Sequence, residues 1–297
     1  MQLCLGTVQF GMNYGIQHAG QPALTDALNI LDIAMQNGIT AIDTAAAYGT
    51  AEEVVGTFID KQENIREKFE LISKLATTTL DDIPKEQYTE TIRKSLLQSL
   101  KKLNTNYLDG YLLHNPADIY NDSVLSALVT LKKEGLVKQI GASVYTPEEA
   151  KKGIEQGLDI LQIPFSVFDQ RMDEQGIFDL ALVNGVKLHA RSIFTQGLML
   201  MDEMDIPPHL ESAKPIVKRL AGFCMKHSIS SVQLAVSFVC MQSGVTHLVF
   251  GVDNKEQLLE IVDAYKHPIA NSILEEAAHQ FAGLDEEIIM PNLWKKT

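Results

Sequence analysis

The feature that most constrains this chain is a regular alternation of short apolar runs with amphipathic segments of helix length. Eight runs rich in branched residues have the length of strands: Leu3–Thr7, Ile39–Ile42, Phe69–Ser73, Leu108–Leu113, Val137–Gly141, Ile160–Ile163, Val186–Ala190 and Leu248–Phe250. Strict alternation demands parallel strands joined by helical crossovers. Eight such units predict a closed (β/α)8 TIM barrel, and a length of 297 residues suits one barrel domain over 1–297.

The intervening segments carry helical signals of their own. Leu24–Gln36 and Tyr88–Leu103 place apolar residues at intervals of three and four. Thr146 precedes a proline and two glutamates, which is the pattern of a helix N-cap followed by an acidic first turn.

Two stretches depart from this regular pattern. Residues 191–212 include Pro207-Pro208 and predict an elaborated loop after the seventh strand. The end of the chain, from about Asn271, predicts one more helix and then an extended tail over 290–297.

Charge and cysteine content limit the partners that we expect. A net charge of −13 argues against nucleic acid, and no apolar run reaches the roughly 18–20 residues that span a bilayer. The N-terminus lacks the basic region of a signal peptide, and three cysteines lie far apart without CxxC spacing. We therefore expect a cytoplasmic monomer or weak homo-oligomer with no membrane partner, no disulfide frame and no metal site.

Four polar residues fall at the ends of three consecutive strands. Asp43 ends the second strand and Tyr48 follows in the loop, while Lys74 ends the third strand and His114 the fourth. In such barrels the active site lies at the C-terminal ends of the strands. The pattern therefore predicts that these four side chains meet on one rim.

This combination suits protonation of a carbonyl oxygen. A tyrosine hydroxyl is a weak acid near neutrality, and a neighbouring ammonium such as that of Lys74 eases its ionisation. Asp43 then holds Lys74 protonated, and His114 orients the carbonyl by hydrogen bonding. If Tyr48 donates a proton to oxygen, a hydride must reach carbon, which implies a nicotinamide cofactor because no side chain supplies hydride.

At this point the chain resembles the aldo-keto reductase family over nearly its whole length. The likeness rests on Leu5-Gly6-Thr7, Ile42-Asp43-Thr44-Ala45 with Tyr48-Gly49, Glu52-Glu53-Val54-Val55-Gly56, Ser73-Lys74, Ser95–Leu103, Leu108-Asp109 with His114, and Gly135–Gly141 leading into Ser143. The resemblance implies a (β/α)8 barrel whose catalytic tetrad is Asp43, Tyr48, Lys74 and His114, with Tyr48 as the general acid.

The resemblance also implies where a nicotinamide cofactor binds, since the family does so without a GxGxxG loop. Ser143 and Gln162 would hold the carboxamide, the run 191–198 would wrap the pyrophosphate, and the segment 251–260 would meet the adenosine half. The implied contacts are Gly6, Thr7, Asp43, Ser143, Gln162, Arg191, Ser192, Phe194, Gln196, Gly197, Leu198, Gly251, Val252, Asp253, Lys255, Gln257 and Glu260.

Three positions depart from the family pattern. Val144 stands where many members have asparagine, and Arg191 stands where many place an aromatic residue against the nicotinamide. A guanidinium stacks on flat rings and also grips carboxylates or phosphates, so Arg191 suits cofactor, substrate or both. Asp253 stands where members that use NADPH often have arginine, and an acidic residue there suits a ribose hydroxyl. We expect NADP(H), the family default, with NAD(H) as the alternative.

The substrate is less constrained than the cofactor. The run 191–198 and the start Gly6-Thr7-Val8-Gln9-Phe10-Gly11 resemble bacterial members linked to polysaccharide and nucleotide-sugar metabolism, which favours a sugar-type carbonyl. Trp294, in the tail, either closes over the substrate or anchors the tail on the barrel.

Two other functions compete with carbonyl reduction. A strand-end lysine beside a tyrosine also suits an aldolase-type lyase that forms a Schiff base on Lys74. A regulatory protein that binds the cofactor with little turnover is the second alternative.

Overall fold

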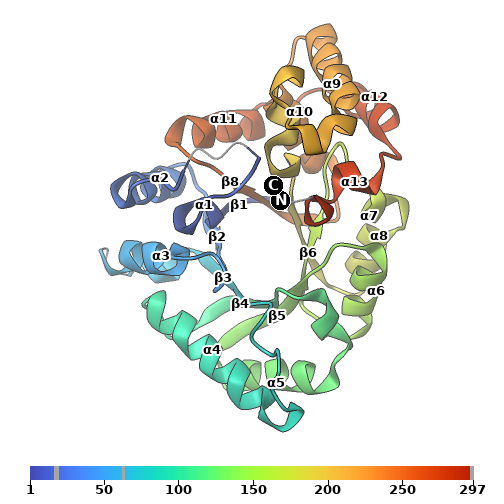
Figure 1. Cartoon of the computed structure of the whole chain (residues 1–297). Helices are drawn as coiled ribbons and strands as arrows, with labels where there is room; N and C mark the ends of the chain where they lie inside the picture. Colours follow the sequence, from blue (N-terminus) through green and yellow to red (C-terminus); the bar gives the residue numbers. More distant parts are fainter. Residues whose placement is uncertain (17–19, 62–63, 295–297) are drawn as a thin grey trace.

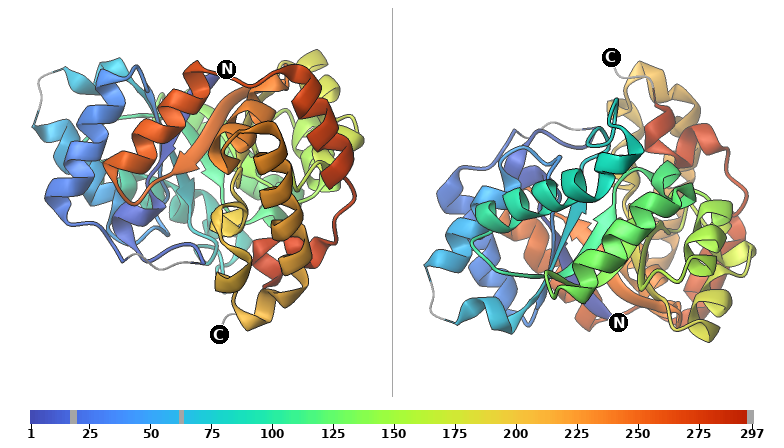
Figure 2. Two further views of the ribbon diagram at one scale, coloured as in Figure 1. Left: turned by 90° about the horizontal axis from the view of Figure 1, so that it is seen from above. Right: turned by 90° about the horizontal axis from the view of Figure 1, so that it is seen from below.

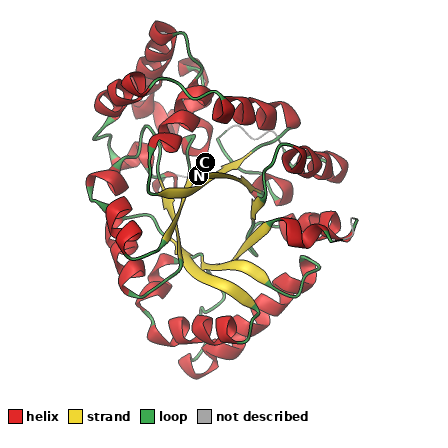
Figure 3. Ribbon diagram, turned by 180° about the vertical axis from the view of Figure 1, so that it is seen from behind, coloured by secondary structure: helices red, strands yellow, loops and turns green. Residues whose placement is uncertain are grey.

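The computed structural model describes residues 1–16, 20–61 and 64–294, and these form a closed barrel of eight parallel strands in sequence order. Figure 3 shows the strands as a ring with the helices outside it. The strands are β1 Gln2–Gly6, β2 Ala41–Asp43, β3 Glu70–Leu75, β4 Leu108–Leu113, β5 Val137–Ser143, β6 Ile160–Pro164, β7 Lys187–Arg191 and β8 Val245–Gly251. The predicted (β/α)8 fold is confirmed.

Helices follow each strand and cover the outside of the barrel (Figure 1). They are α1 Val8–Gly11, α2 Leu24–Gln36, α3 Ala51–Asp60, α4 Tyr88–Lys102, α5 Asp122–Lys133, α6 Pro147–Glu155, α7 Arg171–Glu174, α8 Ile177–Val183, α9 Lys214–His227, α10 Ser231–Met241, α11 Lys255–Lys266, α12 Asn271–Phe281 and α13 Glu286–Ile289. Short 3₁₀ turns are η1 Ile65–Lys68, η2 Lys85–Gln87, η3 Pro116–Tyr120, η4 Thr195–Leu200, η5 Glu203–Asp205, η6 Pro208–Ala213 and η7 Pro291–Leu293.

The region around α9 and α10 departs from simple alternation. The expected elaborated loop after β7 contains η4, η5 and η6, and two helices, α9 and α10, then precede β8. Helix α10 packs against α9, α11 and α12, and both views of Figure 2 show α9, α10 and α12 together on one side of the barrel.

The expected extended tail over 290–297 is wrong in its first part. Helix α12 is followed by α13 and then by η7, because Pro291 starts a further turn. Residues 295–297 lie outside the described part of the chain.

Two apolar clusters stabilise the barrel. A small one fills the interior below the C-terminal rim and consists of Cys4, Ala41, Ile72, Leu112, Ile160 and Val249. A much larger one lies between the strands and the surrounding helices. The interior is therefore a packed core, which leaves the ends of the strands as the place for a ligand.

Helix starts near the rim follow local capping rules. Thr146 forms a capping box with Glu149, in which the Thr146 side chain accepts from the Glu149 N–H and the Glu149 carboxylate accepts from the Thr146 N–H. This confirms the N-cap expected from the sequence. The same carboxylate also accepts from the N–H of Tyr145 at 2.7 Å, so the cap fixes the loop that leaves β5. Within the described residues, no helix has the length and apolar character needed to cross a membrane.

Helix α3, which starts just after Tyr48, is held close to α4 by a glycine. A Cβ atom on Gly56 would lie 2.0 Å from the backbone oxygen of Lys102. Alanine normally stabilises a helix interior by about 1 kcal/mol relative to glycine. Here that gain competes with backbone displacement, and overpacking typically costs about 1–3 kcal/mol.

We predict that Gly56→Ala lowers the free energy of unfolding by about 1–3 kcal/mol, because a backbone oxygen cannot move as a side chain can. The matched control is Gly222→Ala in α9, where nothing lies within 4 Å of the added Cβ and helix propensity alone predicts a gain of about 0.5–1 kcal/mol. Urea denaturation of both variants tests this. Equal stabilisation by the two substitutions would contradict the close packing of α3 on α4.

Candidate active site

The four residues expected to meet do so at the C-terminal end of the barrel. Asp43 is the last residue of β2, Lys74 lies near the end of β3 and His114 directly follows β4. Tyr48 lies in the loop between β2 and α3. Parallel strands deliver their ends to one rim, which is why residues so distant in the chain share a site.

A buried ion pair forms the centre of this site. The Lys74 Nζ atom donates to Asp43 Oδ2 at 2.6 Å, to the backbone oxygen of Thr44 at 3.0 Å and to the Tyr48 hydroxyl at 3.4 Å. The Lys74 side chain is 0% exposed and that of Asp43 4%. The second Asp43 oxygen accepts from Gln162 Nε2 at 2.8 Å. Both charges are therefore paired and hydrogen-bonded, as buried charges must be.

His114 completes the group beside Tyr48. The two rings pack edge to face, with centroids 5.7 Å apart and an interplanar angle of 83°. The Nδ1 atom of His114 is buried and has no hydrogen-bond partner among the described residues. The imidazole is thus held by ring packing rather than by a polar anchor.

The electrostatics of the site set the protonation states. Burial raises the pKa of the Tyr48 hydroxyl, and the opposing charge of Lys74 only partly offsets this. Burial also acts against the Lys74 ammonium, but Asp43 and Tyr48 outweigh it and raise the Lys74 pKa. Burial, together with Lys74 and Arg191, lowers the pKa of His114 to about 3. At neutral pH the site therefore holds a neutral phenol, an ammonium and a neutral imidazole.

The raised pKa corrects one part of the sequence reasoning and weakens one alternative. The ammonium of Lys74 does lower the Tyr48 pKa as expected, but burial is the larger effect and the phenol stays protonated. A Schiff base needs a neutral amine as nucleophile. A buried Lys74 that is charged and bound to Asp43 does not supply one, so the site is poorly suited to the lyase reaction.

Two glycines position Tyr48, a role that sequence reasoning did not assign to them. A Cβ atom on Gly11 would lie 1.8 Å from the backbone oxygen of Tyr48, and one on Gly49 would lie 2.1 Å from the backbone oxygen of Gly11. The loop that carries Tyr48 is therefore in direct backbone contact with the end of α1. The Gly11 within the N-terminal run Gly6–Gly11 was the available sequence signal.

The opposite side of the rim, formed by β5 and β7, carries Arg191. Its guanidinium donates to Ser143 Oγ at 3.2 Å, to Ser192 Oγ at 3.1 Å and to the backbone oxygen of Val144 at 2.8 Å. Its carbon Cζ lies 4.6 Å from the centroid of the Tyr145 ring. Sequence reasoning did not single out Tyr145 for this contact.

The segments expected to hold a cofactor lie on the same rim. The loop after β7 is strained, because Ser192, Thr195 and Gln196 have φ values of 60°, 49° and 54° without being glycine. Strained backbone of this kind clusters at ligand sites. Helix α11 begins just after β8, capped by Asn254, whose side chain accepts from the Gln257 N–H.

The structure divides the individual cofactor positions into two groups. Asp43, Ser143, Gln162, Leu198 and Val252 have buried side chains. Thr7 is also buried, and its hydroxyl donates to the Asp43 backbone oxygen at 3.1 Å. Partly buried or exposed side chains belong to Arg191, Ser192, Phe194, Gln196, Asp253, Lys255, Gln257 and Glu260.

Trp294 lies on the tail and has a defined anchor. Its indole N–H donates to the backbone oxygen of Glu287 at 2.9 Å, and the ring packs against the larger apolar cluster. These contacts favour the anchoring interpretation. Across the described residues, no three His, Cys, Asp or Glu side chains come together in an arrangement that would hold a metal ion.

The sequence of this chain is similar to that of known proteins. Residues 2–277 match the family described as the Aldo/keto reductase family. The chain is 29% identical to a glyoxal reductase of Bacillus subtilis over 215 residues, which is 71% of this chain and 74% of that protein. It is 24% identical to an NADH-specific methylglyoxal reductase of Escherichia coli over 257 residues, 76% of this chain and 78% of that protein.

Solved structures show the same fold. An aldo-keto reductase from Bacillus halodurans in its holo form aligns with a TM-score of 0.74 at 21% identity, covering 95% of this chain and 92% of that one. A putative aldo-keto reductase from Pseudomonas aeruginosa aligns with a TM-score of 0.66 at 24% identity, covering 89% and 88%.

Proposed function

The chain belongs to the aldo/keto reductase family, and on this premise we propose that it reduces an aldehyde or ketone to an alcohol, with hydride from a nicotinamide cofactor and a proton from Tyr48. The observation that carries the proposal is the buried contact between Lys74, Asp43 and the Tyr48 hydroxyl. Membership of this family supports oxidoreductase activity. The relatives named above include reductases of small dicarbonyl compounds.

Each side chain has a role that follows from its protonation state. Tyr48 stays a phenol at neutral pH and donates its proton to the carbonyl oxygen. The Lys74 ammonium, held by Asp43, stabilises the negative charge left on the Tyr48 oxygen. A neutral His114 has one ring N–H, which orients the carbonyl oxygen without competing as a proton donor.

The cofactor-binding residues fit a dinucleotide. A reduced nicotinamide supplies the hydride when it is bound. The strained loop after β7 and the start of α11 present backbone N–H groups at the rim, and such groups bind phosphate oxygens. Ser143 and Gln162 would hold the carboxamide, although Gln162 already donates to Asp43.

We propose NADP(H) as the cofactor, with NAD(H) as the alternative that Asp253 supports. The Asp253 side chain is partly buried at the start of α11, and its N–H donates to Gln257 Oε1 at 2.8 Å. A carboxylate there would repel a 2′-phosphate and accept from a ribose hydroxyl. For substrates, small aldehydes, dicarbonyls and sugar-type carbonyls form the class to screen.

Tyr48→Phe tests the proton donor. We expect the kcat for carbonyl reduction to fall by at least about 100-fold, the contribution of a positioned acid, while the Kd for NADPH stays within about threefold. Steady-state assays and fluorescence titration with NADPH measure the two quantities. Full turnover in this variant would remove Tyr48 from its role.

Cofactor binding without turnover across a wide carbonyl panel would instead favour the regulatory alternative. Borohydride trapping of a substrate on Lys74 would favour the lyase.

The pH dependence follows from the same protonation states. Reduction needs protonated Tyr48, whose pKa is raised, so activity is retained through neutral pH and is lost only as the pH rises through that pKa, above about 10. The His114 pKa of about 3 places no titration between pH 5 and 9. We therefore predict a flat profile of kcat for reduction over that range. A fall in activity near pH 6–7 that disappears in His114→Gln would contradict this assignment.

Asp253→Arg tests cofactor choice. If the Asp253 side chain lies beside the adenosine ribose, replacing it with a cation should shift the ratio of the NADPH and NADH Kd values toward NADPH by about tenfold or more. Parallel fluorescence titrations measure both constants, and Lys255→Gln serves as the neighbouring control with the opposite charge change. An unchanged ratio in Asp253→Arg would place this side chain away from the ribose.

A further inference from the structure

Arg191 is a cation at the candidate active site, and no acid in the described part of the chain neutralises it. Its hydrogen-bond acceptors among the described residues are two hydroxyls and one backbone oxygen, and none is a carboxylate. Lys74, on the same rim, is by contrast paired with Asp43. We propose that Arg191 binds an oxyanion of the substrate, so that the preferred substrate carries a carboxylate or a phosphate a few bonds from its carbonyl. This inference rests on the proposed function.

The guanidinium is held in place and still has free donors. Three of its five N–H groups donate to Ser143, Val144 and Ser192. The remaining two donate to no described residue. One of these belongs to each terminal nitrogen, and a guanidinium can bind a carboxylate or phosphate through both of its terminal nitrogens.

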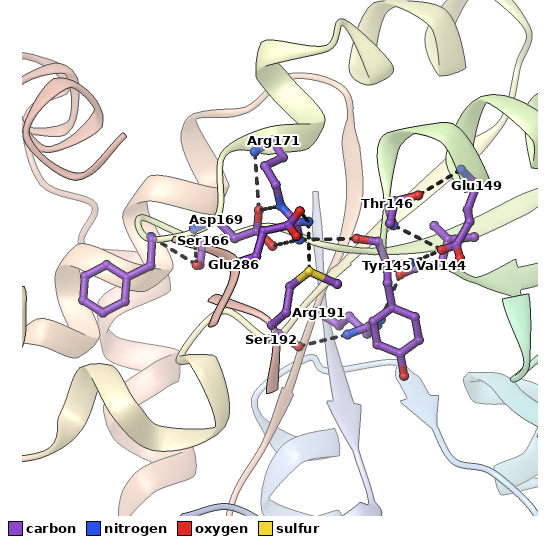
Figure 4. A network of polar contacts seen from close by, with 12 residues as sticks. Val144, Tyr145, Thr146, Glu149, Ser166, Asp169, Arg171, Arg191, Ser192 and Glu286 are labelled. Carbon is purple, nitrogen blue, oxygen red and sulfur yellow. Dashed lines mark hydrogen bonds and ion pairs between the residues drawn. The ribbon is translucent and has the colours of Figure 1, made fainter. Parts of the chain in front are cut away.

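A second set of contacts fixes the platform under Arg191 (Figure 4). The Tyr145 ring stacks on the guanidinium, and the Tyr145 backbone is tied at both ends. Its N–H donates to Glu149, and its oxygen accepts from Arg171 Nη2 at 3.3 Å. A rigid, preformed site loses little conformational entropy when a ligand binds, which favours affinity.

Arg171 in turn links this platform to the C-terminal helix. Its guanidinium forms ion pairs with Asp169 at 2.8 Å and Glu286 at 3.2 Å, and it also donates to Met290 Sδ at 3.2 Å. Figure 4 shows Arg171, Asp169 and Glu286 together, with a dashed line from this group to the backbone oxygen of Tyr145. Arg171 is therefore a fully paired structural cation, and the contrast with Arg191 indicates that the unmatched charge is reserved for a ligand.

The charge balance of the pocket supports an anion. Asp43 balances Lys74, His114 is neutral, and burial raises the pKa of Tyr14 and Tyr48, so that both phenols are uncharged at neutral pH. Among these groups Arg191 is thus the one charge without a counter-ion, in a chain whose overall charge is −13. A local positive site in an acidic protein concentrates anions where the charge lies.

Position favours the substrate over the cofactor as the source of the oxyanion. Arg191 acts electrostatically on Tyr48 and His114, the two groups that contact the carbonyl oxygen in the proposed reaction. The diphosphate of the cofactor also carries oxyanions that could bind Arg191. The experiment below distinguishes binding of a substrate anion from binding of this diphosphate.

Matched pairs of aldehydes with and without an anion test the proposal. We would compare 4-oxobutanoate with butanal, and glyceraldehyde 3-phosphate with glyceraldehyde, in the wild-type protein and in Arg191→Gln. The wild type should prefer the anionic member of at least one pair by tenfold or more in kcat/KM. Arg191→Gln should lose about 10-fold to 100-fold more kcat/KM on that member than on its neutral partner, as expected for a charge-assisted pair.

Two further variants control for charge and folding. Arg191→Lys keeps the charge without the two-pronged geometry and should retain part of the preference. Lys85→Gln removes an exposed cation from η2, just before α4. This variant should leave kcat/KM unchanged for both members of each pair. Circular dichroism confirms that each variant is folded.

The outcomes separate this proposal from the proposed function. No anionic preference in either pair, or equal losses on both members together with a tenfold weaker NADPH Kd in Arg191→Gln, would overturn it and assign Arg191 to the cofactor. If the wild type reduces no carbonyl, the proposed function fails, and calorimetric titration with succinate decides the anion site. Succinate binding that weakens tenfold in Arg191→Gln supports the site, and binding independent of Arg191 overturns it.

Discussion

The candidate site depends on one interaction, the buried pair of Lys74 and Asp43. Removing two charges from water costs several kcal/mol per ion, which is recovered only with good geometry and further hydrogen bonds. Thr44 and Tyr48, both in the loop after β2, and Gln162, on β6, supply those bonds. The pair therefore fixes the neighbours that the proposed chemistry needs.

Close backbone packing helps to hold the loop that carries Tyr48 in place. Gly11 and Gly49 bring the loop of Tyr48 against α1, and Gly56 brings α3 against α4. The opposite wall is set by charge instead, through Arg171 and the capping box of Thr146, which hold Tyr145 beneath Arg191. Glycines that allow close backbone contact thus shape the side of the rim that carries Tyr48. Hydrogen bonds and ion pairs shape the side that carries Arg191. The rim therefore carries the proposed proton donor, Tyr48, on one side and on the other Arg191, which pairs with no carboxylate among the described residues.

Much of the fold followed from local patterns. Periodicity located all eight strands, with boundaries that differ by a few residues, as in β8, which is Val245–Gly251 rather than Leu248–Phe250. The error in the tail arose because Pro291 starts a 3₁₀ turn, η7, which contacts α13. Nothing in the sequence indicated that two helices, α9 and α10, precede β8. The turn that links them, residues 228–230, is short and contains no proline or glycine.

The sequence by itself determined the barrel and the identity of the rim residues, because both depend on short-range periodicity and on which residue ends each strand. It did not determine how those residues affect one another. Asp43 and Gln162 are 119 residues apart, yet their contact helps to hold the central ion pair. The net rise of the Tyr48 pKa, the neutral state of His114 and the unmatched charge of Arg191 also depend on burial and on distances across the barrel. Only the tertiary structure decides these properties, since burial and charge pairing act between groups that the chain brings together by folding.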